Sequence, residues 1–478
     1  MKTKILDVSD FNNEMIRRAE LFREKEALSA IDKAREYIAE AAAVIEGGGL
    51  VAFPTETVYG LGANALDADA VGRLYAAKGR PSDNPMIVHI ARASDIGELS
   101  PKLSPEFVRL ADNFWPGPLS MVMRKKDIVP ERVTGGLETV AVRLPDDPVA
   151  LELIRLSGCP IAAPSANLSG SPSPTRAQHV IADLDGRVDI ILAGGDCRVG
   201  LESTVVDMTA SPPEILRPGI ITADMLSAAL TIDVLYDPTL TSYPRNEVSV
   251  SDTSDKSSGQ TSDQSVDVLY DPSLFTRPGN VSSIGHTSER TMGDTSDKMF
   301  DHTGDMLNDP PSTTHTHNKV STNSSTDLQS ELSINDTTGK IFDMNRISIA
   351  DPDPQSSTSK EAGFGEEDDF HPRSPGMKYK HYAPKAEMII IEGHRDKVSQ
   401  EIDRLKKMNE KLGNKVGILL FEEQSYIEAA HDFYSCLRSL DEEGVDLILA
   451  GALSDKDGVG FAVMNRMMKS AGYKIARV

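Results

Sequence analysis

Cysteine is scarce in this sequence, and long apolar runs are absent from it. The three cysteines, Cys159, Cys197 and Cys436, are far apart and form no Cys-x-x-Cys pair, so a zinc finger, a redox dithiol and a disulfide framework are all disfavoured. No run of 18 apolar residues suits a membrane span, and the first residues lack the apolar stretch of a secretory signal. We therefore predict a cytoplasmic protein without a membrane segment, in which the cysteines are small buried side chains.

Positive charge is also in short supply. The chain has 50 Lys and Arg residues against 73 Asp and Glu, a formal net charge of -23. Lys and Arg that neutralise phosphates supply most non-specific affinity for nucleic acids, so this balance argues against a broad nucleic-acid-binding surface. Little direct contact with nucleic acid is expected, but a local basic pocket is compatible with the composition.

Much of the acidity lies in one segment that has too little apolar surface for a core. Residues 241–370 hold 39 Ser and Thr, and 23 acidic against 9 basic residues. This composition predicts disorder, because apolar burial cannot offset the entropy of ordering the chain. We divide the chain into an N-terminal extension at 1–27, a mixed α/β domain at 28–232, a disordered acidic linker at 233–372, a lid motif at 373–385 and a small α/β domain at 386–478.

Hydrophobic periodicity predicts helices and strands on both sides of the linker. In the first domain we expect helices at 36–48, 68–80 and 104–117, and strands at 50–54, 85–90, 119–123, 139–144, 160–165, 189–194 and 203–208. In the second domain we expect strands at 388–391, 415–421 and 445–451, and helices at 395–412 and 462–472. The alternation in the second domain predicts a small Rossmann-like domain with a mostly parallel sheet.

Polar motifs follow several predicted strands of the first domain. Hydroxyls and glycines at 54–62 follow a strand directly, which indicates either close approach of a ligand to the backbone or a capped tight turn. Lys78 and Arg80 precede Pro81 and make a positive corner, although cations also suit a helix C-terminus for electrostatic reasons alone. Similar small, polar or cationic motifs recur at 163–167, 203–204 and 217–219.

Arg143 lies within an apolar run on a predicted buried strand. A buried arginine almost always has an anionic partner. Its planar guanidinium can bind a ligand carboxylate through two hydrogen bonds, and the alternative partner is an internal Asp or Glu.

The motifs contain no nucleophile–base pair, no cluster of paired carboxylates and no metal-ligand set. The phosphate-binding pattern GxxxxGK[ST] is absent, so any ATP would be held without a P-loop. Together the motifs predict a concave site of cations and hydroxyls that binds and positions anions.

The motifs resemble those of a known family. FPTETVYGLGANA, KGRPSDNPMIVHI, WPGPLSMVM, VAVRLPDDP, AAPSANLSGSPSPT, GLESTVVDM and LRPGIIT occur in the order typical of YrdC-like domains. With SPGMKYKHYAP at 374–384 and VMNRMMKSAG near the end, the whole chain resembles the two-domain threonylcarbamoyl-AMP synthases. This resemblance implies an α/β fold with a YrdC-like mixed N-terminal domain, which carries the concave site, and a small α/β C-terminal domain.

The resemblance also implies a reaction and partners. L-threonine, bicarbonate or CO2, and ATP would give L-threonylcarbamoyladenylate and pyrophosphate, for the threonylcarbamoyladenosine modification of tRNA next to the anticodon. The adenylate would pass to a tRNA threonylcarbamoyl transferase complex. Mg2+ would be carried by ATP, without a metal site on the protein.

Individual residues receive roles from the same resemblance. Lys78, Arg80, Ser165 and Asn167 would act on the phosphates and the carboxylated amine. Threonine would be bound by Thr57, His89, Arg143, Ala163 and Ser203. ATP would be bound by Arg80, Asn84, Thr139, Ser165, Ser173 and Arg217.

The composition of the segment 374–384 predicts that it forms a lid over the nucleotide. It places aromatic and basic residues between prolines, whereas the preceding linker is acidic. A restricted, extended strap loses less entropy on docking and can exclude water, so we expect His381 and Tyr382 to contact ATP. The alternative is a rigid connector between the domains.

Two other functions are weighed against this one. Carbamoyl transfer from carbamoyl phosphate occurs in related domains of hydrogenase maturation proteins, but the sequence lacks their zinc-finger-like cysteines and acylphosphatase segment. A double-stranded RNA-binding or ribosome-binding module is the alternative from another class, and the net acidity argues against it.

Overall fold

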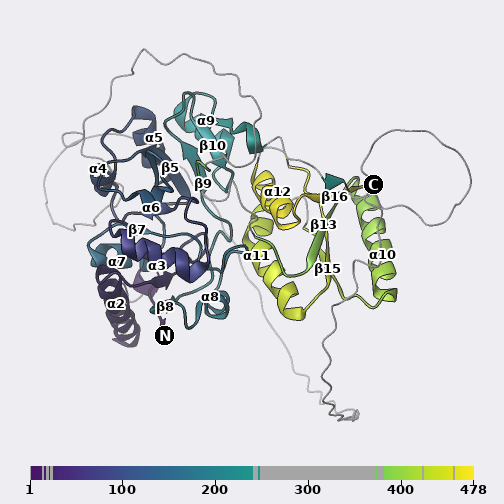
Figure 1. Cartoon of the computed structure of the whole chain (residues 1–478), viewed down its shortest axis with the longest axis horizontal. Helices are drawn as coiled ribbons and strands as arrows, with labels where there is room; N and C mark the ends of the chain where they lie inside the picture. The colour runs from purple at the N-terminus through teal and green to yellow at the C-terminus, as the bar shows by residue number, and fades with distance from the viewer. Residues whose placement is uncertain are drawn as a thin grey trace, which may run out of the picture. The chain divides into compact units, whose positions relative to one another are not determined.

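The computed structural model describes residues 2–12, 15–17, 21, 25–240, 246–247, 372–374, 382–421, 425–455 and 458–478 (Figure 1). Within these residues the chain forms a sheet of eleven strands and a separate sheet of five strands. This arrangement confirms the predicted fold class, a large mixed α/β domain with a second, smaller α/β domain. The predicted linker lies mostly outside the described residues. No helix in the described part is long and apolar enough to cross a membrane.

The large sheet mixes parallel and antiparallel pairs. Its strand order is β1-β8-β2-β3-β7-β4-β6-β5-β9-β10-β11. The strands are β1 (Lys4–Asp7), β2 (Val51–Phe53), β3 (Gly60–Asn64), β4 (Ile87–His89), β5 (Leu119–Arg124), β6 (Thr139–Arg143), β7 (Ile161–Ala162), β8 (Ile190–Ala193), β9 (Thr204–Asp207), β10 (Glu214–Arg217) and β11 (Leu235–Tyr236).

Helices cover this sheet because its strands are apolar on both faces. The helices are α2 (Lys25–Glu46), α3 (Ala68–Lys78), α4 (Ile96–Leu99), α5 (Pro105–Phe114), α6 (Glu131–Thr134), α7 (Pro148–Ser157), α8 (Ala177–Leu184) and α9 (Ala223–Leu230), with short 3-10 helices η1 (Ala93–Asp95) and η2 (Pro238–Leu240). Val51 and Phe53 of β2 pack in one cluster with α2 and α7, whereas Ala52 packs in another with α3 and α5. Successive strand residues therefore face opposite layers, as a pleated strand requires.

Local signals in the sequence set the ends of α3, the helix that carries Lys78. The Asp67 carboxylate accepts hydrogen bonds from the backbone amides of Asp69 and Ala70 at its start. Gly79 ends it in the left-handed conformation at a φ of 64°. The chain then turns sharply, and Arg80 follows immediately after the helix.

The small sheet is parallel in every pair that the structure describes. Its order is β12-β16-β13-β15-β14. The elements are β12 (Asn246–Glu247), β13 (Glu387–Glu392), α10 (Arg395–Lys411), β14 (Val416–Leu419), α11 (Tyr426–Glu443), β15 (Leu447–Gly451), α12 (Val459–Ser470) and β16 (Lys474–Arg477). The predicted mostly parallel sheet is thus confirmed.

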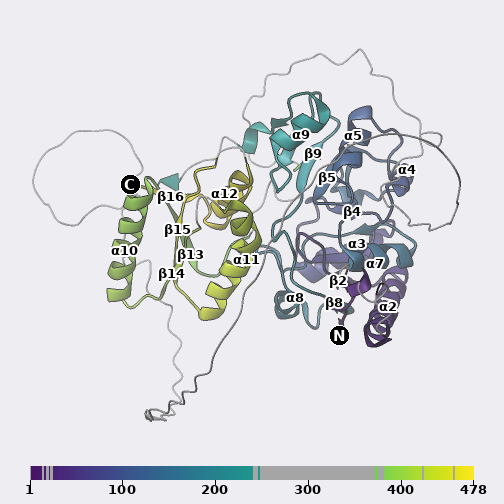
Figure 2. The same cartoon turned by 180° about the vertical axis from the view of Figure 1, so that it is seen from behind.

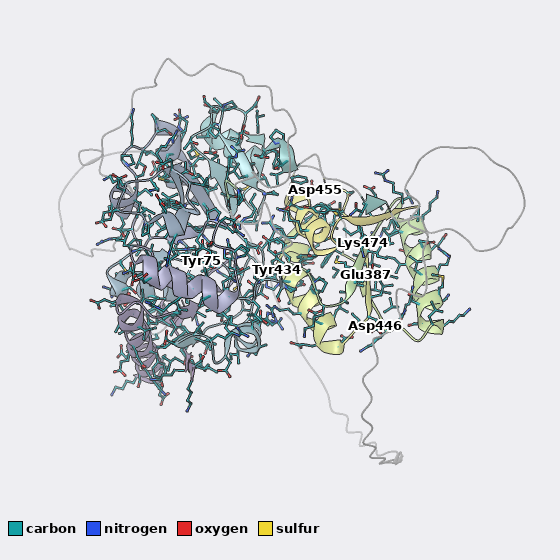
Figure 3. The ribbon with its side chains drawn as sticks, viewed as in Figure 1. Tyr75, Glu387, Tyr434, Asp446, Asp455 and Lys474 are labelled. Carbon is teal, nitrogen blue, oxygen red and sulfur yellow. The ribbon has the colours of Figure 1, made fainter. Side chains whose placement is uncertain are left out.

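Helices lie on both faces of the small sheet, as the two opposite views show (Figures 1 and 2). Met388 and Ile390 of β13 pack with α11 and α12, whereas Ile389 and Ile391 pack with α10. An ion pair between Lys474 and Glu387 links the neighbouring strands β16 and β13 (Figure 3). Two layers of helix around a parallel sheet explain why its strands read as continuous apolar runs.

Several strands lie where the sequence predicted no structured domain. β1 belongs to the range that we assigned to an N-terminal extension, yet it pairs with β8 in the large sheet. β11 and β12 belong to the range that we assigned to the linker, yet they pair with β10 and β16. These strands have only two to four residues, and their partners are mostly remote in sequence, so local periodicity carries little signal for them.

Arg373 at the start of the lid motif is attached to the large sheet. Its guanidinium pairs with Asp207 at 3.2 Å, with Glu214 at 3.1 Å, and with Asp237. Residues 375–381, which hold most of the motif, lie outside the described residues. Tyr382, near the end of the motif, is among the described residues.

Candidate active site

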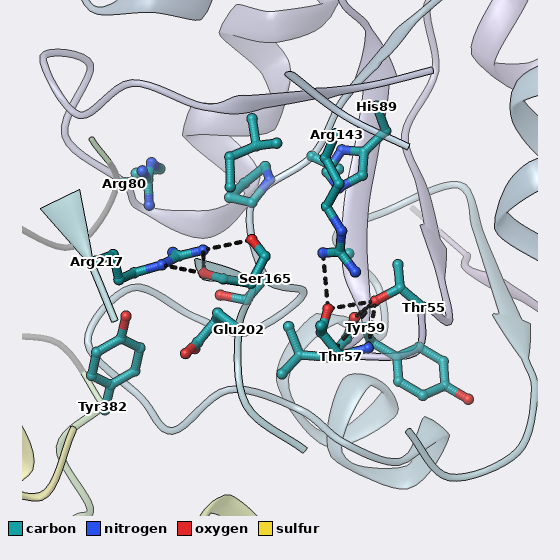
Figure 4. A pocket seen from close by; sticks show the side chains of 16 residues that line it. Thr55, Thr57, Tyr59, Arg80, His89, Arg143, Ser165, Glu202, Arg217 and Tyr382 are labelled. Atoms are coloured by element: carbon teal, nitrogen blue, oxygen red, sulfur yellow. Dashed lines mark hydrogen bonds between the residues drawn. The ribbon is translucent and has the colours of Figure 1, made fainter. Parts of the chain in front are cut away.

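One pocket of ≈ 600 Å³, a volume that includes open solvent at its mouth, gathers the polar motifs of the first domain (Figure 4). His89 and Arg143 are register partners at the ends of the parallel strands β4 and β6, so they enter it side by side. Most of the others come from the turn after β2, the loop after β7, the residues just before β9 and the strand β10, while Arg80 follows α3 and Tyr382 belongs to the lid motif. The lining residues are Thr55, Thr57, Val58, Tyr59, Gly60, Arg80, Ile87, His89, Arg143, Ala163, Pro164, Ser165, Glu202, Ser203, Arg217 and Tyr382.

Every residue predicted to bind threonine lines this pocket: Thr57, His89, Arg143, Ala163 and Ser203. Four of the residues predicted to bind ATP line it as well: Arg80, Ser165, Arg217 and Tyr382. Residues from many separate segments thus meet in one place, as a concave site requires.

Arg143 has both a pocket-lining position and an internal anionic partner. Its Nη1 donates to Thr57 Oγ1 at 2.9 Å, and its Nε donates to the Gly117 carbonyl at 3.3 Å. Its Nη2 lies 2.6 Å from Oε2 of Glu56, and both side chains are less than 5% exposed. This contact is an ion pair without hydrogen-bond geometry, and Arg143 Nη2 and both Glu56 oxygens make no hydrogen bond. The alternative partner for Arg143, an internal carboxylate, is therefore present.

The turn that carries Thr57 is held by its own hydroxyls. Thr55 Oγ1 donates to the Val58 carbonyl at 2.7 Å, accepts from the Thr57 amide at 3.2 Å, and lies 2.9 Å from Thr57 Oγ1. Figure 4 shows these bonds beneath the Arg143 guanidinium. The turn is therefore capped by its own hydroxyls, and it also lines the pocket.

His89 is neutral at physiological pH. Burial and, to a smaller extent, the charge of the neighbouring Arg143 lower its pKa from 6.5 to about 3. Its Nδ1 has no hydrogen-bond partner in the described structure, although the ring lines the pocket. A neutral imidazole supplies a hydrogen-bonding group without adding a charge.

The titration of His89 predicts a loss of stability in acid. Between pH 6.5 and about 3 the unfolded state binds a proton at His89 that the folded state does not, so stability falls as pH falls through this window. From pH 7.5 to 5.5 we expect the wild type to lose ~1.4 kcal/mol more of its free energy of unfolding than His89→Gln. Urea denaturation of both proteins at both pH values measures this difference in the free energy of unfolding. Equal losses in wild type and His89→Gln would show that His89 does not titrate in this way.

Ser203 and Arg217 form a second polar group in the pocket. Arg217 donates to the Ser203 carbonyl through Nε at 3.1 Å and Nη2 at 2.9 Å, and its Nη2 also donates to Ser203 Oγ at 3.1 Å. The Ser120 and Ser203 hydroxyls are 2.8 Å apart. Burial lowers the pKa of Arg217 from its ordinary value, but a guanidinium keeps its charge near neutral pH.

Lys78 and Asn167 lie behind the pocket wall. Lys78 is buried, and its Nζ donates to the carbonyls of Ser165 and Asn167 and, at 3.3 Å, to Asn167 Oδ1. Asn167 Nδ2 donates to the Leu168 and Ser171 carbonyls at 2.8 Å each. Burial, followed by the charge of Arg80, lowers the pKa of Lys78 well below its ordinary value. The two side chains hold the loop that presents Ser165, and neither is among the lining residues.

The remaining predicted ATP residues lie at different depths. Arg80 lines the pocket and donates to the Pro85 carbonyl at 2.8 Å. Asn84 is buried and Thr139 starts β6 at the end opposite Arg143, and neither is among the lining residues. Ser173 is fully buried and donates to Glu202 Oε1 at 2.6 Å. His381 lies outside the described residues.

Tyr382 reaches the pocket from the lid motif. Its carbonyl accepts a hydrogen bond from Ser470 Oγ at 2.9 Å, and the next residue, Ala383, donates its amide to the Gly170 carbonyl at 2.8 Å. These bonds attach the motif to α12 on one side and to the first domain on the other.

Sequence reasoning missed three acidic or basic residues around the pocket. Glu202 lines it, Glu56 pairs with Arg143, and Arg466 of α12 pairs with Glu202. Glu56 and Glu202 lie inside motifs that we had quoted, next to Thr57 and Ser203, but their partners are far away in sequence. In the described part of the chain, no three His, Cys, Asp or Glu side chains form a group suited to a metal ion.

These features define an α/β protein with a cationic, hydroxyl-rich pocket for small anionic ligands. The domain family described as "Telomere recombination" (Sua5, YciO and YrdC) matches residues 43–219. The family described as "Threonylcarbamoyl-AMP synthase, C-terminal domain" matches residues 343–472.

Relatives match over nearly the whole chain. The threonylcarbamoyl-AMP synthase of Pyrococcus abyssi is 36% identical over 466 residues, which cover 94% of this chain and 100% of the relative. That of Bacillus subtilis is 35% identical and covers 92% of this chain and 94% of the relative. The crystal structure of P. abyssi Sua5 complexed with L-threonine has a TM-score of 0.63 and 34% identity, over 93% of this chain and 96% of that chain. The chain belongs to the threonylcarbamoyl-AMP synthase family.

Proposed function

We propose that this chain is a threonylcarbamoyl-AMP synthase that binds L-threonine and ATP in the pocket described above and takes its carboxyl group from bicarbonate or CO2. The observation that carries the proposal is the convergence on one pocket of all five residues expected to bind threonine, with Arg80 and Arg217 beside them. The family membership supports the same reaction.

Arg143, Thr57 and His89 are the proposed threonine site. The Arg143 guanidinium lines the pocket, and a planar cation with five N–H donors can bind a substrate carboxylate as well as Glu56. Neutral His89 and the Thr57 hydroxyl supply hydrogen bonds without another charge. The Ala163 backbone and Ser203 complete this site.

Arg80, Ser165 and Arg217 are proposed to bind the nucleotide. Their charges and hydroxyl would neutralise and orient the phosphates, in the absence of a P-loop. Lys78 and Asn167 would act on the nucleotide indirectly, by holding the loop that carries Ser165. Mg2+ would arrive on the triphosphate and reduce its negative charge, because the described residues offer no carboxylate cluster for it.

The chemistry needs positioning more than it needs a nucleophile on the protein. The neutral threonine amine attacks the carbon of CO2: a C–N bond forms, one C=O π bond opens onto its oxygen, and the nitrogen releases a proton to water, which leaves an N-carboxylate. An oxygen of that carboxylate attacks the α-phosphorus of ATP, the bond to the bridging oxygen of the β-phosphate breaks, and pyrophosphate leaves. A carbamate is labile in water, so the protein must hold both reactants together and exclude solvent.

The product is a reactive mixed anhydride, so a second enzyme must use it promptly. We propose that a transferase complex that modifies tRNA in the cytoplasm accepts the threonylcarbamoyl group. Direct RNA binding by this chain is the less favoured alternative, since the net charge of -23 opposes it.

Pyrophosphate exchange tests the reaction directly. The purified protein should incorporate labelled pyrophosphate into ATP only when threonine and bicarbonate are both present, because the reversible step requires the N-carboxylate. The controls omit each substrate in turn. Exchange that is independent of threonine would contradict the proposed function.

A further inference from the structure

Glu202 is a pocket-lining carboxylate whose partners come from both domains. Its Oε1 accepts from Ser173 Oγ at 2.6 Å and from the Tyr434 hydroxyl at 2.9 Å. Its Oε2 lies 3.0 Å from the same hydroxyl and 3.2 Å from Nε of Arg466. Ser173 belongs to the first domain, whereas Tyr434 lies on α11 (Figure 3) and Arg466 on α12.

The Arg466–Glu202 pair is deeply buried and depends on correct docking of the second domain. The Arg466 side chain is 0% exposed and that of Glu202 is 7% exposed. Arg466 Nη1 also donates to the Pro218 carbonyl at 2.7 Å, next to Arg217. Burial raises the pKa of Glu202, but the charges of Arg466 and Arg217, together with hydrogen bonds from Ser173 and the Glu202 amide, outweigh burial and leave the pKa below its ordinary value. The carboxylate is therefore charged, and it needs a cationic partner.

The backbone just before Glu202 is fixed by the same docking. Leu201 is fully buried in a cluster with Phe433 and other residues of the second domain. Gly200 has a φ of 74°, and a side chain there would meet the His431 carbonyl oxygen of α11 at 2.2 Å. The loop before Ser203 thus follows the surface of α11 closely, with no room for an added Cβ.

The position of Glu202 bears on both proposed substrate sites. It immediately precedes Ser203, whose carbonyl and hydroxyl accept three hydrogen bonds from Arg217. It also holds Ser173 through that residue's hydroxyl. A charged Glu202 without Arg466 would compete with a nucleotide for the guanidinium of Arg217, because opposite charges attract strongly where water is excluded.

We propose that Arg466 and Tyr434 are positioning residues: they bond to the Glu202 carboxylate and limit its attraction for Arg217, so that the second domain sets the affinity of the pocket for both substrates. The inference rests on the proposed function, since it names Arg217 as a nucleotide-binding group. It gives the second domain a defined role in substrate binding.

Arg466→Met tests the inference, with Arg438→Met as a matched control. Arg438 also links the domains, through Asp183 at 2.8 Å and the Pro172 carbonyl, but it does not contact Glu202. Calorimetry of ATP and threonine binding, pyrophosphate exchange and melting temperature are compared for wild type and variants. We expect Arg466→Met to weaken ATP binding at least about tenfold and threonine binding by a smaller factor, and Arg438→Met to change either by less than about threefold.

A charge-neutral double variant separates positioning from folding. Adding Glu202→Gln to Arg466→Met removes the uncompensated carboxylate, so ATP affinity should return to within about threefold of wild type. Tyr434→Phe keeps the ring and removes only the hydroxyl, so it tests the same idea if Arg466→Met does not fold, with an expected loss of ATP affinity of about threefold or more. Kinetically, KM for ATP should rise more than kcat falls.

Equal losses of melting temperature in the Arg466 and Arg438 variants, with ATP affinity unchanged in Tyr434→Phe and Arg466→Met, would overturn the inference. So would a double variant that binds ATP as weakly as Arg466→Met alone. Failure of the proposed function would show differently, as wild-type protein that binds ATP but shows no threonine-dependent exchange.

Discussion

Replacing Arg143 with alanine is expected to weaken threonine binding at least about 30-fold, because truncating one partner of a buried, hydrogen-bonded charge pair costs about 2–5 kcal/mol. The variant also leaves Glu56 buried without its cation, so a loss of about 3–5 kcal/mol in folding stability is expected as well. ATP affinity should change much less, since no phosphate-binding role is proposed for Arg143. Calorimetry with each substrate and thermal unfolding measure these effects.

The two effects of Arg143→Ala can be separated, because the structure identifies the internal partner. In Arg143→Ala with Glu56→Gln, no unpaired carboxylate remains, so the melting temperature should recover most of its loss. Threonine affinity should stay low, because the group proposed to bind the substrate carboxylate is still missing. A double variant that binds threonine as tightly as wild type would show that Arg143 serves only its ion pair with Glu56.

Replacing Lys78 with methionine is expected to lower kcat/KM at least about 30-fold, although Lys78 does not line the pocket. Its ammonium holds the carbonyls of Ser165 and Asn167, and two buried carbonyls without a donor cost ~1–3 kcal/mol each. The Ser165 loop would relax, and the hydroxyl proposed to bind ATP would move with it. Steady-state kinetics with both substrates measures the loss.

Asn167→Ala shows whether Lys78 acts through this loop. Asn167 holds the same segment by its side chain. In the double variant with Lys78→Met and Asn167→Ala, the loss of kcat/KM should therefore be clearly less than the two single losses combined. Additive losses would indicate that Lys78 contacts the phosphates itself, as the sequence resemblance had implied.

Much of the site was visible in the sequence because its motifs follow apolar strands. The strands ending at His89 and Arg143 were predicted from their apolar runs, and a parallel pairing places both ends together. The short strands were missed for the opposite reason: β1 pairs with β8 about 186 residues away, and four residues carry too little periodicity to show it.

The sequence by itself determined the two α/β domains, the motif set, the family and the absence of a P-loop, because each depends on short-range patterns in the chain. Only the tertiary structure decided which charges pair with one another. It placed Glu56 on Arg143, Lys78 on the Ser165 loop, and Arg466 on Glu202 across 264 positions of sequence. Buried ions select partners by distance and solvent exclusion in the folded state, and neither quantity is written in the spacing of residues along the chain.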